Sequence, residues 1–189
     1  MLAIKTRQAY LKALGFYKGA VDGKVGVKTK AAYKALQQRY FDRKSDIDGV
    51  YGNNTDILLI NAYRVHIYCK SFKLEEFKCQ CGGKYCTGYP VVLDSQLLCN
   101  VQAIRNKYGV TAITSGLRCA KHNSAVGGAS GSRHKSGKAL DIQNKQTATE
   151  SKRKVLMNYY KTLPKYRYTY CNIGGNYPNM GNSVHIDVK

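Results

Sequence analysis

Ser183-Val-His-Ile-Asp-Val188 is the segment of this chain that most constrains the fold. Apolar side chains alternate in it with Ser183, His185 and Asp187. Because successive side chains of a β-strand point to opposite faces, one face is hydrocarbon and the other carries a hydroxyl, an imidazole and a carboxylate. An ordinary half-exposed strand would carry Lys, Thr or Glu there. The segment therefore predicts a strand that borders a polar site.

A second segment of the same kind is Ser132-Arg-His-Lys-Ser-Gly-Lys-Ala-Leu-Asp-Ile142. Its glycine turns the chain, after which Asp141 lies on a predicted strand, with His134 on the loop before it. If this strand pairs with the last one, Asp141 and His185 face each other and His134 closes a triangle. Two imidazoles and one carboxylate are a recurring ligand set for a catalytic Zn²⁺ ion, which keeps a fourth position for water.

The rest of the second half of the chain mixes helices and strands without the regular β-α-β alternation of a parallel sheet. Helical spacing and capping residues predict one helix from Asp94 to Tyr108 and another that follows a capping box at Thr147-Ala-Thr-Glu150. Alternating apolar residues predict further strands at 110–114, 138–143 and 166–173. Residues 69–189 are therefore predicted to form an α+β domain with an antiparallel sheet.

An internal repeat organises the first third of the chain. Asp22-Gly-Lys-Val-Gly-Val-Lys-Thr29 and Asp48-Gly-Val-Tyr-Gly-Asn-Asn-Thr55 both follow the pattern D-G-x-x-G-x-x-T. Each copy predicts a tight turn at its glycines, followed by a helix that starts near the threonine. Apolar residues recur at helical spacing over 6–14, 28–40 and 55–66. Residues 1–68 are therefore predicted to form a small all-α unit of three helices.

The chain of 189 residues carries a formal net charge of +20. So strong a positive balance implies a polyanionic partner, such as nucleic acid, an anionic lipid surface or an anionic cell-wall polymer. The basic residues are spread over both halves and no known nucleic-acid-binding motif occurs, which disfavours nucleic acid. No apolar run approaches the ~18 residues of a membrane span, and the first residues lack the apolar core of a secretory signal.

Seven cysteines are an odd number, so they cannot all pair in intramolecular disulfides. Cys79, Cys81 and Cys86 form a C-x-C-x4-C cluster that could be a metal knuckle. No fourth ligand is evident, however, and the spacing is not that of a zinc ribbon, so structural thiols are favoured over a metal site. The other four are isolated and are predicted to be small buried thiols: Cys69, Cys99, Cys119 and Cys171.

These motifs resemble two known families. Residues 5–65, with Leu14-Gly-Phe-Tyr-Lys-Gly-Ala-Val-Asp-Gly23 and Lys30-Ala-Ala-Tyr-Lys-Ala-Leu-Gln-Gln38, resemble the peptidoglycan-binding domain of cell-wall hydrolases. Residues 72–189 resemble the zinc D-Ala-D-Ala carboxypeptidases and their endolysin peptidase relatives, which belong with Hedgehog-like zinc domains. The second likeness is carried by Ser132-x-His134-x2-Gly137-x-Ala139-x-Asp141, Val184-His185-x-Asp187, the stretch 114–128, and Phe77-Lys-Cys-Gln-Cys-Gly82.

The second resemblance implies roles for individual residues. His134, Asp141 and His185 match the zinc ligands of the family. Arg118 matches an arginine near the substrate, where it would hold a peptide carboxylate or polarise the carbonyl oxygen. Ser132 is expected to hydrogen-bond the substrate.

The general base is not settled by the resemblance. Many relatives place an acid three residues before the last ligand, where this chain has Asn182, which cannot usefully accept a proton. Asp187 shares the strand face of His185. We therefore expect Asp187 to act as the base or as a residue that orients the site.

Together the resemblances imply a peptidoglycan-binding domain at 1–68 and a zinc peptidase domain at 69–189. The expected activity is that of an endolysin or autolysin with one catalytic Zn²⁺ ion, which hydrolyses an amide bond of cell-wall stem peptides through a metal-activated water. A D-Ala-D-Ala carboxypeptidase that trims stem peptides, or a non-catalytic wall-binding protein with a structural zinc, are the alternatives.

Partners and location follow from the same reasoning. The expected partners are peptidoglycan and anionic cell-wall polymers, with neither nucleic acid nor membrane, and the expected state is a monomer. Because no signal peptide is evident, the protein is expected to be made in the cytoplasm. It would then reach the bacterial cell wall by another route, through holin-type release or lysis.

Overall fold

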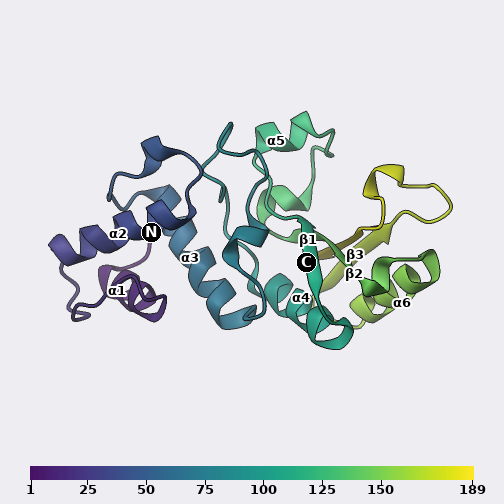
Figure 1. Ribbon diagram of the computed structural model, residues 1–189, viewed down its shortest axis with the longest axis horizontal. Helices are drawn as coiled ribbons and strands as arrows, with labels where there is room; N and C mark the ends of the chain where they lie inside the picture. The colour runs from purple at the N-terminus through teal and green to yellow at the C-terminus, as the bar shows by residue number, and fades with distance from the viewer.

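The computed structural model describes residues 1–189, which form six α-helices, one four-stranded sheet and short 3₁₀ turns (Figure 1). The helices are α1 (Ile4–Ala13), α2 (Val27–Tyr40), α3 (Asn53–Tyr68), α4 (Ser95–Tyr108), α5 (Ala120–Ala125) and α6 (Glu150–Lys161). The strands are β1 (Thr111–Ser115), β2 (Ala139–Asn144), β3 (Tyr166–Cys171) and β4 (Val184–Val188). The predicted α+β class is confirmed. None of the helices combines the length and the apolar character that crossing a bilayer requires.

The three helices α1–α3 lie at one end of the molecule (Figure 1). A buried glutamine forms hydrogen bonds with each of the two D-G turns that connect them. Gln37 of α2 donates from Nε2 to Asp48 Oδ1 at 2.9 Å and accepts at Oε1 from the Gly49 N–H at 2.7 Å. Gln8 of α1 makes the equivalent bonds to the first copy of the turn, at 2.8 Å each. The sequence repeat is therefore also a repeated set of hydrogen bonds made by a buried glutamine.

The threonines of the repeat lie in the first turns of α2 and α3, after the N-cap residues Gly26 and Gly52. Thr29 and Thr55 are buried. The Oγ1 atom of each donates to a carbonyl oxygen of the preceding turn, at 3.3 and 3.2 Å. Each threonine thus ties its turn to the helix that follows.

The sheet has the strand order β1-β2-β4-β3, and every neighbouring pair is antiparallel. The pairing that the sequence argument took as its condition is present: β2 pairs with β4, and Asp141 lies opposite His185 in the register. Val184, Ile186 and Val188 of β4 belong to the hydrophobic core, which α4 and α6 cover on one side of the sheet (Figure 1). The alternation along β4 therefore turns His185 to the opposite face.

Two details differ from the sequence prediction. The N-cap of α6 is Thr149, whose Oγ1 accepts from the Lys152 N–H at 3.3 Å, and not Thr147. Thr147 instead closes a 3₁₀ turn by donating to the Asn144 carbonyl oxygen at 2.9 Å. The short helix α5 was not predicted, because six residues of mixed polarity show no helical periodicity.

One hydrophobic core runs from the helical unit into the sheet. Asn61 of α3 is fully buried and accepts from the Leu93 N–H at 2.7 Å while donating to the Val91 carbonyl oxygen at 2.9 Å. Asp94, which follows Leu93 in the chain, donates its N–H to the carbonyl oxygen of Gly137 at 2.9 Å, just before β2. A continuous set of contacts therefore links α3 to the polar face of the sheet.

Replacing Gln37 by alanine is expected to lower the free energy of unfolding by about 2–3 kcal/mol, because Asp48 and Gly49 lose buried hydrogen-bond partners. The midpoint of urea unfolding measures this change. Gln38→Ala is the matched control: the residue is exposed on the same helix, and its loss should cost less than about 0.5 kcal/mol. Equal shifts for the two variants would show that the buried glutamine does not hold the turn.

Candidate functional site

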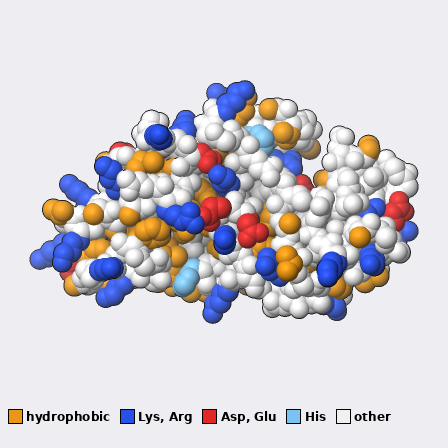
Figure 2. Space-filling model, viewed as in Figure 1, with side chains coloured by type: hydrophobic (Ala, Val, Ile, Leu, Met, Phe, Trp, Pro, Cys, Tyr) orange, Lys and Arg blue, Asp and Glu red, His pale blue; other side chains and the backbone are white.

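A cleft of about 770 Å³ opens on the polar face of the sheet. Much of its lining comes from two stretches of the chain, 126–129 with 131–134, and 176–180. Figure 2 shows the surface notched between α5 and the lobe that includes the loop before β4. His134, Asp141 and His185 lie at the bottom of this cleft, and all three side chains are buried.

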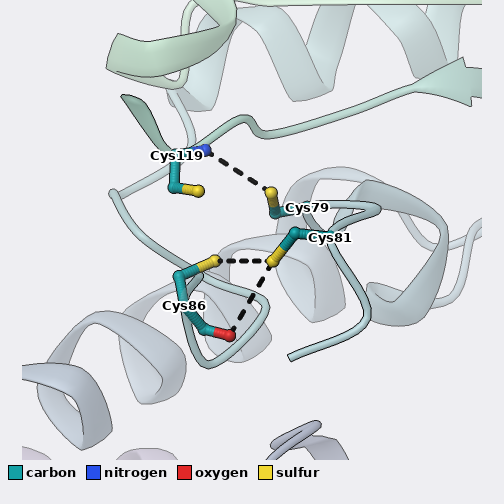
Figure 3. Close-up of side chains that lie close together, drawn as sticks. All are labelled: Cys79, Cys81, Cys86 and Cys119. Atoms are coloured by element: carbon teal, nitrogen blue, oxygen red, sulfur yellow. Dashed lines mark hydrogen bonds between the residues drawn. The ribbon is translucent and has the colours of Figure 1, made fainter. Parts of the chain in front are cut away.

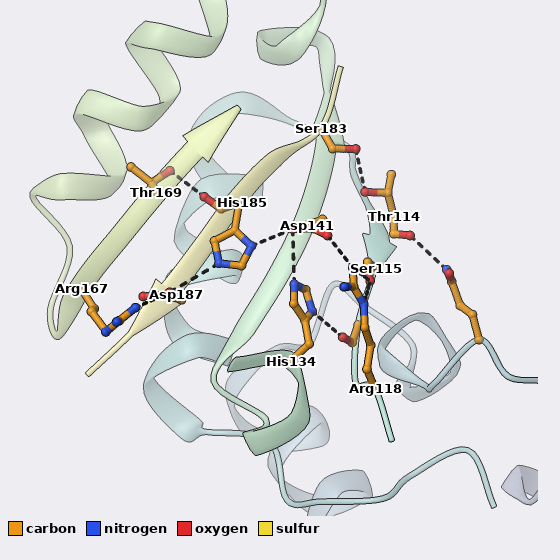
Figure 4. A network of polar contacts seen from close by, with 12 residues as sticks. Thr114, Ser115, Arg118, His134, Asp141, Arg167, Thr169, Ser183, His185 and Asp187 are labelled. Atoms are coloured by element: carbon orange, nitrogen blue, oxygen red, sulfur yellow. Dashed lines mark hydrogen bonds and ion pairs between the residues drawn. The ribbon is translucent and has the colours of Figure 1, made fainter. Parts of the chain in front are cut away.

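Three potential metal ligands converge there (Figure 4). His134 Nε2 lies 3.4 Å from Asp141 Oδ1, and His185 Nδ1 lies 2.8 Å from the same oxygen. One donor atom from each residue lies within 4.8 Å of the other two. The structure therefore brings together the three residues that the sequence predicts as ligands, from a 3₁₀ turn, from β2 and from β4.

The outer nitrogen of each imidazole has a partner of its own. His134 Nδ1 lies 2.7 Å from the Gly116 carbonyl oxygen, which can only accept, so this nitrogen carries the proton. His185 Nε2 faces Asp187 Oδ2 at 3.4 Å, which favours a proton there. In the tautomers that carry the proton on these outer nitrogens, each ring turns a lone pair towards Asp141 Oδ1. Three acceptors at such short range repel one another unless a cation lies between them.

The pKa shifts of Asp141 and His185 also favour a cation at this site. Burial alone would lower the pKa of His185, but its hydrogen bonds to Asp141 and Asp187 raise that pKa above the ordinary value. Burial would raise the pKa of Asp141, but hydrogen bonds with the two histidines hold it well below its usual range. The site therefore attracts positive charge, as a proton or as a metal ion. Imidazole nitrogen and carboxylate oxygen are ligands that Zn²⁺ accepts, so the residues present fit that ion.

Arg118 and Ser132, the two residues predicted to contact substrate, both line the cleft. Arg118 donates from Nη2 to Asp141 Oδ2 at 3.1 Å, and from Nε and Nη2 to Ser115 Oγ at 2.9 and 2.7 Å. These bonds hold the guanidinium beside the carboxylate of Asp141. Nη1 takes no part in them and can contact a bound molecule. Ser132 immediately precedes the 3₁₀ turn that carries His134.

Asp187 is buried beside His185, at the ring nitrogen that faces away from the other ligands. Its Oδ2 also accepts from Arg167 Nη1 at 3.0 Å. Of the two roles that the sequence leaves open, this position suits the orientation of His185. Asn182, three residues before His185, is held by another contact: its Oδ1 accepts from Arg153 Nη1 at 3.2 Å.

Sequence reasoning missed the residues of β3 that surround His185. Tyr170 stacks on the His185 ring, with centroids 4.5 Å apart, and Arg167 pairs with Asp187. The available signal was the alternation in Tyr166-Arg-Tyr-Thr-Tyr-Cys171. That alternation becomes informative only with the register, which places Tyr170 opposite His185.

A second cluster of potential ligands lies apart from His134, Asp141 and His185. The Sγ atoms of four cysteines lie within 4.8 Å of one another: Cys79, Cys81, Cys86 and Cys119 (Figure 3). The prediction that Cys119 is an isolated buried thiol is therefore wrong, and Cys99, predicted to be buried, is partly exposed. The turn before α5 brings it against Cys79, whose Sγ accepts from the Cys119 N–H at 3.4 Å. The neighbouring Cys86 thiol and the Cys119 N–H hold the pKa of Cys79 below its ordinary value.

Comparison with known protein families bears on both halves of the chain. The family model described as Peptidase M15 matches residues 70–187. The model described as a putative peptidoglycan binding domain matches residues 2–55. A search of curated proteins found no match. The first match covers the sheet and its cleft, and the second covers α1, α2 and both D-G turns.

Gly116, whose carbonyl oxygen contacts His134, packs closely against the backbone of Phe77. A Cβ atom at Gly116 would lie 2.3 Å from the Phe77 carbonyl oxygen, so Gly116→Ala should lower the free energy of unfolding by about 1–3 kcal/mol. Gly131→Ala is the control, because a Cβ there would meet nothing within 4 Å. Thermal unfolding compares the two variants, and equal stability would contradict the close packing.

Proposed function

The chain belongs to the peptidase M15 family, and we propose that it is a zinc-dependent peptidase that hydrolyses an amide bond in peptidoglycan stem peptides. The observation that carries the proposal is the convergence of His134 Nε2, Asp141 Oδ1 and His185 Nδ1 at the bottom of an open cleft. The peptidoglycan-binding match supports peptidoglycan as a partner and the cell wall as the place of action.

When bound, zinc supplies Lewis-acid chemistry that activates a water molecule and polarises a scissile carbonyl. In the proposal, His134 and His185 hold the ion through neutral ring nitrogens, and Asp141 holds it through a carboxylate oxygen. The Gly116 carbonyl keeps the proton of His134 on Nδ1, and Asp187 keeps that of His185 on Nε2. The nitrogens that face the ion therefore stay unprotonated, which a metal ligand requires.

The charges that line the cleft suit a substrate with a carboxylate. Three arginines line it: Arg118, Arg133 and Arg167. Its acidic residues are Asp141 and Asp187, both buried and both paired with an arginine. We assign Arg118 Nη1 to a substrate carboxylate or to the carbonyl oxygen on which negative charge develops. Ser132, at the rim of the His134 turn, is assigned a hydrogen bond to the peptide.

The two halves of the chain are assigned different tasks. Residues 1–68 hold the enzyme on the wall, and residues 69–189 carry the peptidase. A groove of about 620 Å³ on the helical unit combines cations with aromatic rings: Arg7, Lys30, Lys34, Tyr33 and Tyr51. Figure 2 shows Lys and Arg side chains distributed across the visible face. Such a charge distribution favours broad attraction to anionic wall polymers, which weakens as salt rises.

A second candidate function is the trimming of a terminal D-alanine from the stem peptide. The position of Arg118 favours it, because a guanidinium beside the metal ligands can hold a terminal carboxylate next to the bond that is cut. The two functions share the site and differ in the bond that is cleaved. The products therefore separate them.

His134→Ala is expected to abolish zinc binding in the cleft and the release of products from peptidoglycan, because it removes one of three protein ligands. His66→Ala is the control, since His66 is exposed near the end of α3 and does not line the cleft. Mass spectrometry of muropeptides reads the result. New amine and carboxyl ends within a stem or cross-link indicate lysis, and loss of a terminal alanine indicates trimming. Wall binding by the unmodified protein without any product would contradict the proposal.

Asp187→Asn separates an orienting role from that of a base. If Asp187 holds His185, the variant should bind zinc about 10–100-fold more weakly, and excess zinc should restore much of its activity. Competition with a chelator measures the zinc affinity. If Asp187 were the base, kcat would fall by about 10²–10⁴-fold with zinc affinity unchanged. That second result would refute the orienting role.

A further inference from the structure

We propose that Cys79, Cys81, Cys86 and Cys119 bind a second zinc ion, which is structural and separate from the ion in the cleft. Zinc–sulfur bonds of about 2.3 Å in a tetrahedral site place the four sulfur atoms about 3.8 Å apart. In the structure, Cys81 Sγ and Cys86 Sγ are 3.5 Å apart, and all four sulfurs lie within 4.8 Å of one another. A small contraction around an ion therefore completes the tetrahedron.

The surroundings of the sulfur atoms suit thiolates. The Cys119 N–H donates to Cys79 Sγ, and the His122 N–H donates to Cys119 Sγ, both at 3.4 Å. Such backbone donors stabilise the negative charge of metal-bound thiolates. The four sulfurs form one compact group and not two separate pairs, and all of these cysteines are free thiols (Figure 3). Cys79 is buried and the other three are partly exposed, so an ion can enter from solvent.

A bound ion also explains how an irregular part of the chain is ordered. Residues 78–94 contain neither helix nor strand, and Gly82, Gly83 and Gly88 adopt positive φ values within them. Segments of this length without regular structure are uncommon inside compact domains. Three of the proposed ligands lie in this segment, and the fourth comes from the turn before α5. The ion would therefore join two distant parts of the chain.

The proposed ion lies behind the backbone that shapes the cleft. The Leu117 N–H donates to the Phe77 carbonyl oxygen at 2.8 Å, two residues before Cys79. The neighbouring Gly116 carbonyl holds His134, and Arg118 directly precedes Cys119. Zinc at the cysteines would thus hold residues 116–118 in place. Gly116 contacts the proposed metal ligand His134, and Arg118 is a candidate substrate-binding residue. We assign these cysteines a positioning role, since none of them lines the main cleft.

Metal analysis of the full chain, purified under reducing conditions, tests the proposal. We expect about two zinc ions per chain in the unmodified protein, and about one in Cys81→Ser/Cys86→Ser. Cys99→Ser is the matched control, because Cys99 is a partly exposed thiol of α4 outside the cluster, and it should keep both ions. One zinc in the unmodified protein, retained in the double variant, would overturn the inference. So would iron in place of zinc, or a mass lowered by a disulfide among these cysteines.

The same measurement keeps this inference distinct from the proposed function. His134→Ala should lose the cleft ion and keep the cysteine ion, whereas the double variant should do the reverse. If the cleft bound no metal, His134→Ala would leave the zinc content unchanged.

Cobalt substitution of the unmodified protein covers the case in which the double variant fails to fold. Cobalt at a four-thiolate site gives intense sulfur-to-metal charge-transfer absorption in the near ultraviolet, which the cleft ligands cannot produce. Absence of that band at full cobalt loading would refute the cysteine site.

Discussion

The carboxylate of Asp141 is the constraint around which the cleft and its sheet are arranged. It lies on a strand between apolar neighbours and is only 6% exposed. A buried charge without partners costs several kcal/mol, so the fold must surround it with donors or cations. One of its oxygens meets the two histidines, and the other meets Arg118. The second partners of those residues, such as the Gly116 carbonyl, then fix the tautomers that let the cluster accept a metal ion.

The register between β2 and β4 decides whether Asp141 meets His185. A slip of one residue between β2 and β4 would separate Asp141 from His185 and turn core residues towards the cleft. The apolar face of β4 prevents that slip, because α4 and α6 bury it. The helical unit is joined to the same core, and Asn61 ties it to the segment before α4. Packing on one face of the sheet therefore maintains the chemistry on the other.

Much of this could be predicted from the sequence, because strand alternation and helical spacing are local signals. They predicted the α+β class and the strands of Asp141 and His185, whose pairing entered only as a condition. Contacts made by residues distant in the chain left no such signal. Cys119 joins the other cysteines only through the turn before α5, and Tyr170 meets His185 only through the register of β3. The cap at Thr149 was missed because two threonines compete locally, and their hydrogen bonds decide between them.

The central claim is that three side chains from separate elements form one metal site with these particular donor atoms. Anomalous X-ray diffraction at the zinc absorption edge, on crystals grown with zinc, tests it most directly. The account predicts a peak in the cleft bonded to His134 Nε2, Asp141 Oδ1 and His185 Nδ1, with bond lengths near ~2.0–2.2 Å. No peak there at saturating zinc, or an ion bonded to the outer ring nitrogens, would contradict it.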